Sequence, residues 1–167
     1  MSTRHAVVDT ALGRLTLVAD GDAISGVYFA HHWHRPAERS FGLLVSETED
    51  ALLDAARRQL VEYFAGERTA FDLPLSDAGD DFDRSVWALI DDVPYGHTTT
   101  YGGLAAALGD RRLAYEVGQA VGRNPICVIR PCHRVVGKDG SLTGYAGGLR
   151  RKRQLLELEA SRRKAVS

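Results

Sequence analysis

Residues 98–125, TTTYGGLAAALGDRRLAYEVGQAVGRNP, carry the pattern of two short helices joined by a tight glycine-aspartate turn. Thr99 or Thr100 can cap the first helix, Gly109 can end it, and Pro125 limits the second. Leucine and valine recur at helical spacing on one side of each segment. Such a pair is typical of a helix-turn-helix, whose second helix enters a DNA groove. Helical hairpins are also common in proteins that never touch DNA, so the motif alone leaves the function open.

The sequence before this stretch predicts a small sheet covered by a helix. Apolar and polar residues alternate over residues 5–10, 13–20 and 23–30, with turn signals between them, which indicates a three-stranded antiparallel meander. Residues 49–66 place apolar side chains at helical spacing and end at a glycine. We expect a further short strand at residues 69–75.

The remaining segments predict a helical half that carries one unusual cysteine. We expect a helix from residue 81 that Pro94 ends, a buried strand at residues 126–130, a glycine-rich loop, and a helix from about Leu149 to Ala160. The fold class is therefore α+β with two lobes. We divide the chain into an N-terminal α/β lobe (residues 1–78), a C-terminal helical lobe with the helix-turn-helix (residues 79–160) and a basic tail (residues 161–167).

Composition and length fit an ordinary globular protein. The chain has 167 residues, 44% of them hydrophobic and 26% charged. Its apolar runs are too short for a membrane span, and its start lacks the apolar core of a signal peptide, so we expect a cytoplasmic protein with no membrane partner. Cys127 and Cys132 lie too close in sequence for a disulfide framework, which fits a reducing compartment.

Charge is distributed unevenly along the chain. Residues 111–167 carry 13 Lys and Arg against 4 Asp and Glu, a net charge of +9, and residues 1–110 carry 8 against 18, a net charge of -10. A basic half favours a polyanion such as nucleic acid as partner. The alternative is that these charges do no more than keep a surface solvated.

A loop at residues 31–42, HHWHRPAERSFG, interrupts all periodicity. Its histidines, His31, His32 and His34, could bind a metal, but no acidic or cysteine residue lies nearby at a ligand spacing. We therefore expect an exposed loop.

Residues 131–137, PCHRVVG, place a thiol between a proline and an imidazole, with a guanidinium next along the chain. A basic neighbourhood lowers the pKa of a thiol, and the thiolate is the nucleophile. Cys132 is therefore a candidate nucleophile and His133 its candidate base. A carboxylate usually orients such an imidazole, and Glu157 or Glu159 could supply one if the last helix folds back.

Other interpretations of Cys132 stay open on spacing alone. The thiol could be a small buried hydrophobe beside a surface imidazole. Cysteine proteases place the cysteine at the start of a helix with the histidine far away, unlike PCHR after a strand. Zinc binding by Cys127, Cys132 and His133 would need a fourth ligand and a different spacing. We expect no metal, and we expect Cys127 in the core.

Several ordered motifs between about Phe82 and Glu159 resemble the O6-alkylguanine-DNA alkyltransferases, also called methylated-DNA-protein-cysteine methyltransferases. They are NP at residues 124–125, then PCHRVVG, GYAGG and KRQLLELE. The N-terminal half agrees only in its general plan. The resemblance implies a suicide DNA repair enzyme that flips O6-alkylguanine out of double-stranded DNA and transfers the alkyl group to Cys132 without a cofactor. We expect it to act as a monomer.

The same resemblance implies roles for individual residues. His133 would deprotonate Cys132 through a water, and Glu159 would orient His133. Asn124 would brace the turn that holds the cysteine, and Tyr101 would assist base rotation and protonation of the leaving group. Tyr145 and the backbone at Ala146 and Gly147 would line the base pocket, and Val135 and the Cys132 carbonyl would read the guanine amino group. Related proteins without transfer activity carry tryptophan in place of the nucleophile. Because this chain has Cys132 at that position, the resemblance excludes this inactive class.

One segment departs from the family pattern. Family members usually carry an arginine in a segment like RAVG, which fills the gap left by the flipped base, whereas this chain has YEVG at residues 115–118. We hypothesise that Tyr115 stacks in the gap and that an arginine elsewhere supplies the lost charge. The candidate DNA contacts are Tyr115, Gly118, Arg111, Arg112 and Arg123. Weak flipping, or a substrate other than ordinary duplex DNA, is the competing view. The alternative functions are a DNA-binding damage-sensing module with weak or no transfer and, less favoured, a cysteine hydrolase.

Overall fold

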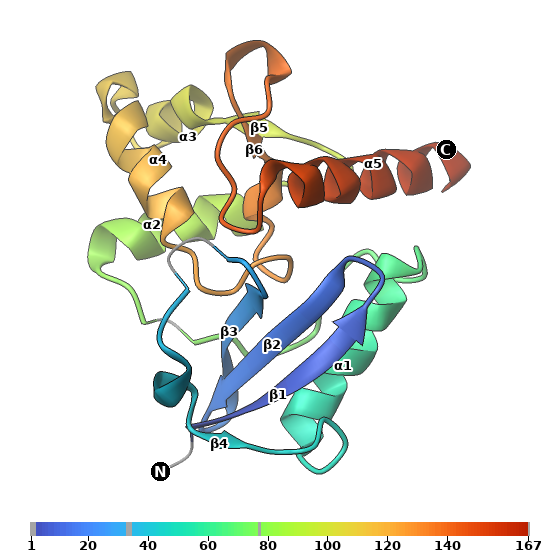
Figure 1. The fold of residues 1–167 in the computed structure, drawn as a ribbon. Coiled ribbons are helices and arrows are strands. Elements are labelled where there is room, and N and C mark those ends of the chain that lie inside the picture. The colour runs from blue at the N-terminus through green and yellow to red at the C-terminus, as the bar shows by residue number, and fades with distance from the viewer. Residues whose placement is uncertain (1–2, 33–34, 77, 167) are drawn as a thin grey trace.

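A computed structural model describes residues 3–32, 35–76 and 78–166, and it begins with the predicted meander (Figure 1). Strands β1 (Thr3–Thr10), β2 (Gly13–Asp20) and β3 (Ala23–Phe29) pair antiparallel in chain order. Their inward side chains are fully buried, as alternation along half-buried strands requires. A short strand that the sequence did not indicate, β4 (Leu43–Leu44), adds to the free edge of β1 in parallel.

Helix α1 (Ala51–Phe64) packs against this sheet, as predicted (Figure 1). The Asp50 carboxylate caps it by accepting hydrogen bonds from the backbone N–H groups of Leu52 and Leu53. Leu53, Ala56 and Leu60 face the strands and are fully buried. The sheet and α1 therefore share one apolar layer in the N-terminal lobe.

The predicted strand at residues 69–75 is wrong. Only one bridge forms there, between Leu75 and Ile24 of β3, with hydrogen bonds from Ile24 N to Pro74 O (2.8 Å) and from Ser76 N to Ile24 O (2.8 Å). Pro74 has no N–H group to donate, so a longer ladder cannot form through it.

The C-terminal lobe is helical. Its helices are α2 (Asp81–Asp91), α3 (Tyr101–Ala107), α4 (Ala114–Gly122) and α5 (Leu149–Val166). Thr100 caps α3, and a 3-10 turn capped by Asp110 separates α3 from α4, which gives the expected helix-turn-helix. Helix α5 continues beyond Ala160, so the segment expected as a tail is helical as far as Val166. None of the described helices is long and apolar enough to cross a membrane.

The predicted buried strand at residues 126–130 is also wrong, because this segment folds as tight turns. The N–H of Ile129 donates to Cys127 O (2.8 Å), which closes a γ-turn centred on Val128 with a φ of 72°. The N–H of Cys132 donates to Arg130 O (2.7 Å) and closes a second turn of the same size. A β-branched residue at positive φ is strained, and such strain is found mostly at functional sites.

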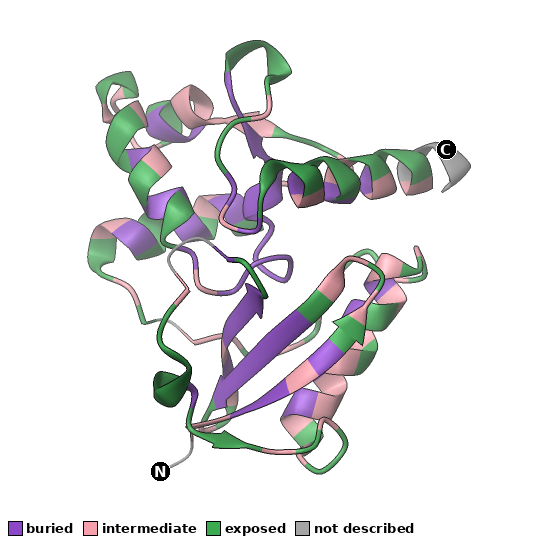
Figure 2. Ribbon diagram, in the orientation of Figure 1, coloured by how far each residue is buried: buried purple, intermediate pink, exposed green. Residues whose placement is uncertain are grey.

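The two lobes share one hydrophobic core. The turns at residues 126–131 lie between them (Figure 2). The N–H of Val27 in β3 donates to Pro125 O (2.9 Å), and Val27 forms a parallel bridge with Ile126. A two-stranded parallel pair, β5 (Thr99–Thr100) with β6 (Val135–Val136), joins the start of α3 to the segment after Cys132. The N-terminal lobe thus directly supports the residues around the cysteine.

The histidine-containing loop is only partly exposed. His31 is exposed as expected, but the His32 imidazole is buried against Tyr28 and Phe29. His34 lies outside the described residues. The described part of the chain contains no group of three or more His, Cys, Asp or Glu residues that could hold a metal ion.

Candidate active site

Cys132 begins a single 3-10 turn, Cys132–Arg134, immediately after Pro131. Its side chain is buried and lies on the wall of a cavity of about 470 Å³. The cavity is walled by α3, α4, the turn segment and the glycine-rich loop, which contribute Tyr101, Tyr115, Gly118, Gln119, Asn124, Cys127, Thr143, Tyr145 and Ala146 among others. The structure therefore places two buried thiols, Cys127 and Cys132, on the wall of a mostly apolar pocket.

Two hydrogen-bonding side chains and one positive charge act on the turn that holds Cys132. The Asn124 amide accepts a hydrogen bond from Ile126 N (3.0 Å) and donates one to Arg130 O (3.2 Å), so it braces both γ-turns. Hydrogen bonds from Cys127 and Asn124, together with the charge of Lys152, lower the pKa of the Cys132 thiol against the opposing effect of burial. The thiolate is thus stabilised in a buried place.

His133 and Glu159 form the buried pair that the sequence suggested. His133 Nε2 lies 2.8 Å from Glu159 Oε2, and both side chains are almost inaccessible to water. Because Nε2 must donate its proton to the carboxylate, Nδ1 carries the lone pair, and within the described residues Nδ1 has no hydrogen-bond partner. Burial lowers the pKa of His133, although Glu159 acts in the opposite direction, so the imidazole rests neutral. Glu157 is exposed on the same helix and takes no part.

Two side chains that sequence reasoning missed also bind Glu159, as does the backbone N–H of Gly96 (3.2 Å). Arg134 donates two hydrogen bonds to its carboxylate (2.9 Å each), and the Tyr63 hydroxyl from α1 donates another. Burial alone would raise the pKa of Glu159, but the hydrogen bonds from His133 and Arg134 lower it to about 2. The carboxylate is therefore charged under any physiological condition and keeps His133 in one orientation.

Lys152 is a third residue that the sequence did not single out. It is fully buried on α5, and its ammonium donates to the carbonyls of Val135 (2.6 Å) and Thr143 (2.7 Å). No ion pair between Lys152 and a carboxylate is present among the described residues. Burial lowers its pKa to about 8, and the Cys132 thiolate opposes that change. Lys152 thus links the backbone segments at Val135 and Thr143 and places a positive charge close enough to stabilise the Cys132 thiolate.

The residues expected to form the base pocket fall into two groups. Tyr145 and Ala146 line the cavity. Val135 is fully buried and does not form part of its wall, and one lone pair of its carbonyl is occupied by Lys152. Gly147 also lies outside the wall, and a Cβ there would come within 2.6 Å of the Phe29 ring, so a glycine is required for packing between the lobes.

The helix-turn-helix exposes an aromatic ring and two arginines. Tyr115 is 74% exposed at the start of α4, and it lines the cavity together with Gly118 and Tyr101. Arg112 pairs with Asp110 (3.0 Å) at the surface, and Arg111 belongs to the same turn.

Arg123 differs from the other candidate DNA contacts. Its guanidinium binds Asp83 of α2 at 2.6 Å, and this largely buried carboxylate neutralises its charge. The expected use of Arg123 on DNA phosphates is therefore disfavoured.

Two protein-family models together match nearly the whole chain. The model described as 6-O-methylguanine DNA methyltransferase, DNA binding domain, matches residues 81–161, and the model of the ribonuclease-like domain of the same protein matches residues 3–76. The chain belongs to the 6-O-methylguanine DNA methyltransferase family. The expected resemblance is thereby confirmed in both halves, including the N-terminal half, whose sequence agreed only in general plan.

Relatives with known names support the same assignment. The methylated-DNA--protein-cysteine methyltransferase of Mycobacterium tuberculosis is 40% identical over 158 residues, covering 95% of this chain and 93% of that protein. The constitutive enzyme of Bacillus subtilis is 37% identical and covers 86% of each chain. The crystal structure of Mycobacterium tuberculosis OGT in complex with DNA superposes with a TM-score of 0.84 at 40% identity, over 95% of this chain and 94% of that one. The α+β fold expected from the sequence is confirmed.

Proposed function

We propose that this protein repairs double-stranded DNA by transferring the alkyl group of O6-alkylguanine irreversibly to its own Cys132. The observation that carries the proposal is the placement of Cys132 on the wall of a pocket, followed directly in the chain by His133, which is paired with the charged Glu159. Membership of the 6-O-methylguanine DNA methyltransferase family supports the same reaction.

The chemical step is a displacement at carbon. The Cys132 thiolate attacks the alkyl carbon in line with the bond to guanine O6; a carbon–sulfur bond forms as the carbon–oxygen bond breaks. The electron pair of the broken bond goes to the base, which takes up a proton and leaves as guanine. A thioether is not displaced by water under these conditions, so each protein molecule reacts once. An atom inside a stacked duplex cannot be approached in line, so the base must first be flipped out.

His133 would act as the base in this proposal. Its neutral state and its lone pair at Nδ1 suit it to accept the thiol proton through a bridging water. Glu159 would hold the imidazole and stabilise the imidazolium that results. Asn124 would keep the turn, and hence the Cys132 sulfur, in place.

The pocket residues would receive the flipped base. Tyr145 and Ala146 line the cavity, whose volume of about 470 Å³ leaves room for a purine and its substituent. The Tyr101 hydroxyl, which accepts a hydrogen bond from Thr143 (3.1 Å), would protonate the leaving group. Val135 and Gly147 would act indirectly, Val135 by anchoring Lys152 through its carbonyl and Gly147 by allowing close packing against Phe29.

Tyr115 would be the residue that enters the duplex. Its ring is exposed at the cavity mouth, on the second helix of the helix-turn-helix, where it can stack in the gap left by the base. Arg111 and Arg112 would contact phosphates near Gly118, where the α4 backbone can approach the DNA closely. We propose that one protein molecule, acting as a monomer in the cytoplasm, binds one lesion.

A single experiment separates this function from its alternatives. The protein is incubated with a duplex oligonucleotide carrying O6-methylguanine, and the intact protein is weighed by mass spectrometry. Alkyl transfer predicts a gain of one methyl group that is absent in Cys132→Ser. A damage-sensing module would shift the mobility of the DNA without a change in protein mass, and a cysteine hydrolase would turn over an ester or amide repeatedly.

A further inference from the structure

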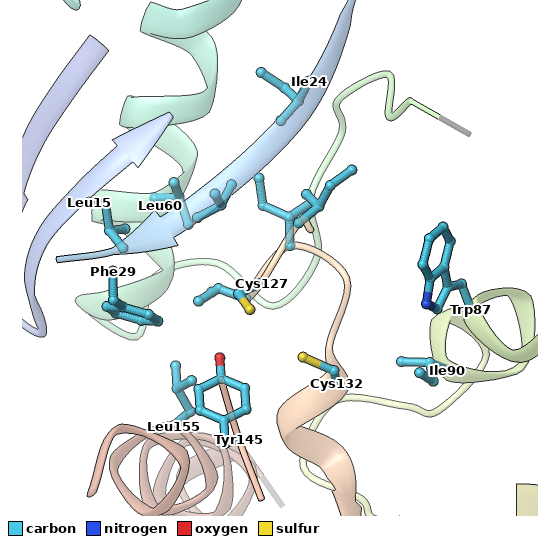
Figure 3. Close-up of a cluster of buried hydrophobic side chains, with 14 of the residues drawn as sticks. Leu15, Ile24, Phe29, Leu60, Trp87, Ile90, Cys127, Cys132, Tyr145 and Leu155 are labelled. Carbon is cyan, nitrogen blue, oxygen red and sulfur yellow. The ribbon is translucent and has the colours of Figure 1, made fainter. Parts of the chain in front are cut away.

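A second thiol faces the proposed nucleophile across the cavity. Cys127 is 1% exposed and lines the same pocket as Cys132. Figure 3 shows the two sulfur atoms pointing toward one another, with the Tyr145 hydroxyl directed toward Cys127. The γ-turn at Val128 reverses the chain and so brings these two side chains together. Cys127 is thus more than the core residue that its apolar neighbours suggest.

A buried imidazole fixes the direction of the hydrogen bonds around Cys127. The backbone N–H of Phe29 donates to His32 Nδ1 (3.2 Å), so Nδ1 is the acceptor and the proton of the neutral ring sits on Nε2. His32 Nε2 lies 3.7 Å from Cys127 Sγ, within the range of a hydrogen bond to sulfur. The imidazole therefore donates to the sulfur of Cys127, and the thiol hydrogen is left to donate elsewhere.

We propose that Cys127 is a catalytic hydrogen-bond donor that stabilises the Cys132 thiolate, and that His32 is the positioning residue that aims it. The hydrogen bonds run in one direction: from Phe29 N–H to His32, from His32 to Cys127, and from Cys127 to the Cys132 sulfur. This inference rests on the proposed role of Cys132 as nucleophile. It gives a purpose to the buried histidine of the N-terminal loop, which the metal and exposed-loop interpretations did not explain.

The shifts in thiol acidity agree with this direction. The hydrogen bond between the two thiols lowers the pKa of Cys132 and, together with burial, raises that of Cys127 well above its usual value. Cys127 therefore keeps its proton while Cys132 ionises, as a donor must. The other groups that face Cys132 are the Lys152 ammonium, the Asn124 amide and the Tyr145 hydroxyl, whose pKa burial raises. Lys152 and Asn124 keep their backbone contacts when Cys127 is replaced, whereas Tyr145 loses its hydrogen bond with the Cys127 thiol, a loss that Cys127→Ser can restore.

The test compares Cys127→Ala, which removes the donor, with Cys127→Ser, which keeps a hydroxyl donor. Iodoacetamide labelling of Cys132 is followed against pH by peptide mass spectrometry, together with single-turnover methyl transfer from duplex DNA. We expect Cys127→Ala to react about tenfold more slowly at pH 7 and to recover toward the wild-type rate at high pH, where the thiol ionises without help. Cys127→Ser should follow the wild-type profile, and His32→Leu should lie between the two.

Several outcomes would overturn the inference. They are a wild-type pH profile in Cys127→Ala, equal slowing of the alanine and serine variants, or a methyl group found on Cys127. If Cys127→Ala fails to fold, a wild-type profile in His32→Leu would overturn the relay instead. The labelling needs no DNA, so it separates this inference from the proposed function: absence of methyl transfer in the wild-type protein refutes the repair reaction, whereas an unchanged labelling profile refutes the donor.

Discussion

Replacing Glu159 by glutamine tests the buried pair behind Cys132 most sharply, because the structure gives both a size and a pH dependence. The pKa of Glu159 falls from 4.5 to about 2 in the folded protein. At about 1.36 kcal/mol per pH unit, the ionised carboxylate contributes about 3 kcal/mol to the free energy of unfolding. A depressed folded-state pKa means that this contribution is complete above pH 4.5 and is lost as pH falls toward 2.

We therefore expect the free energy of unfolding of Glu159→Gln at pH 7 to be about 3 kcal/mol lower than that of wild type, in urea titrations followed by circular dichroism. The difference should shrink by about 2 kcal/mol between pH 7 and pH 3, because below pH 4.5 this carboxyl takes up a proton in the unfolded wild-type chain while it stays ionised in the folded protein. Glu157→Gln, an exposed neighbour on α5, is the matched control and should change the stability by less than about 0.5 kcal/mol. A pH-independent difference, or equal stabilities of the two variants, would refute the reasoning.

Three further predictions concern residues around the same pocket. Lys152→Met should slow methyl transfer at pH 7 about tenfold, because it removes the positive charge near the Cys132 thiol. Arg153 is the exposed next residue of α5, and Arg153→Met should leave the single-turnover rate unchanged. Equal rates in the two variants would contradict this role of Lys152. Tyr63→Phe removes one donor to Glu159 and should cost about 2 kcal/mol in urea unfolding, and an unchanged midpoint would show that the hydroxyl contributes nothing. Tyr115→Ala should slow transfer from duplex DNA by tenfold or more but leave transfer from the free base unchanged. Tyr115→Arg should steepen the dependence of duplex affinity on salt concentration by the amount expected for about one additional phosphate contact. Transfer from duplex DNA at the wild-type rate in Tyr115→Ala would show that Tyr115 is not part of the DNA interface.

Periodicity and elementary thiol chemistry predict much of this molecule. The meander, α1 and the helix-turn-helix follow from spacing of apolar residues, because each of these elements buries one regular face. Cys132 and His133 stand out because a thiol between proline and a basic pair is unusual in an apolar segment. The choice between Glu157 and Glu159 needed the helix orientation, which only the packing of α5 fixes.

Other features could not be read from the chain. An apolar run such as residues 126–130 has the composition of a buried strand. Its γ-turns depend on hydrogen bonds with the Asn124 side chain, which donates one and accepts the other, and on contact with β3. Tyr63 reaches Glu159 from a distant helix in the other lobe, so no local pattern marks it. Lys152 sits in a segment rich in arginine and lysine, where a solvated surface is the ordinary expectation.

The central claim is that Cys132 accepts one alkyl group and is then spent. It is tested most directly by mixing the protein with an excess of duplex DNA carrying O6-methylguanine labelled in the methyl carbon, and locating the label in peptides of the protein after the reaction stops. The account predicts one methyl group per protein molecule, all of it on the Cys132 sulfur, with an equal amount of guanine restored in the DNA. Label on another residue, repaired guanine in excess of the protein, or transfer that persists in Cys132→Ser would contradict it.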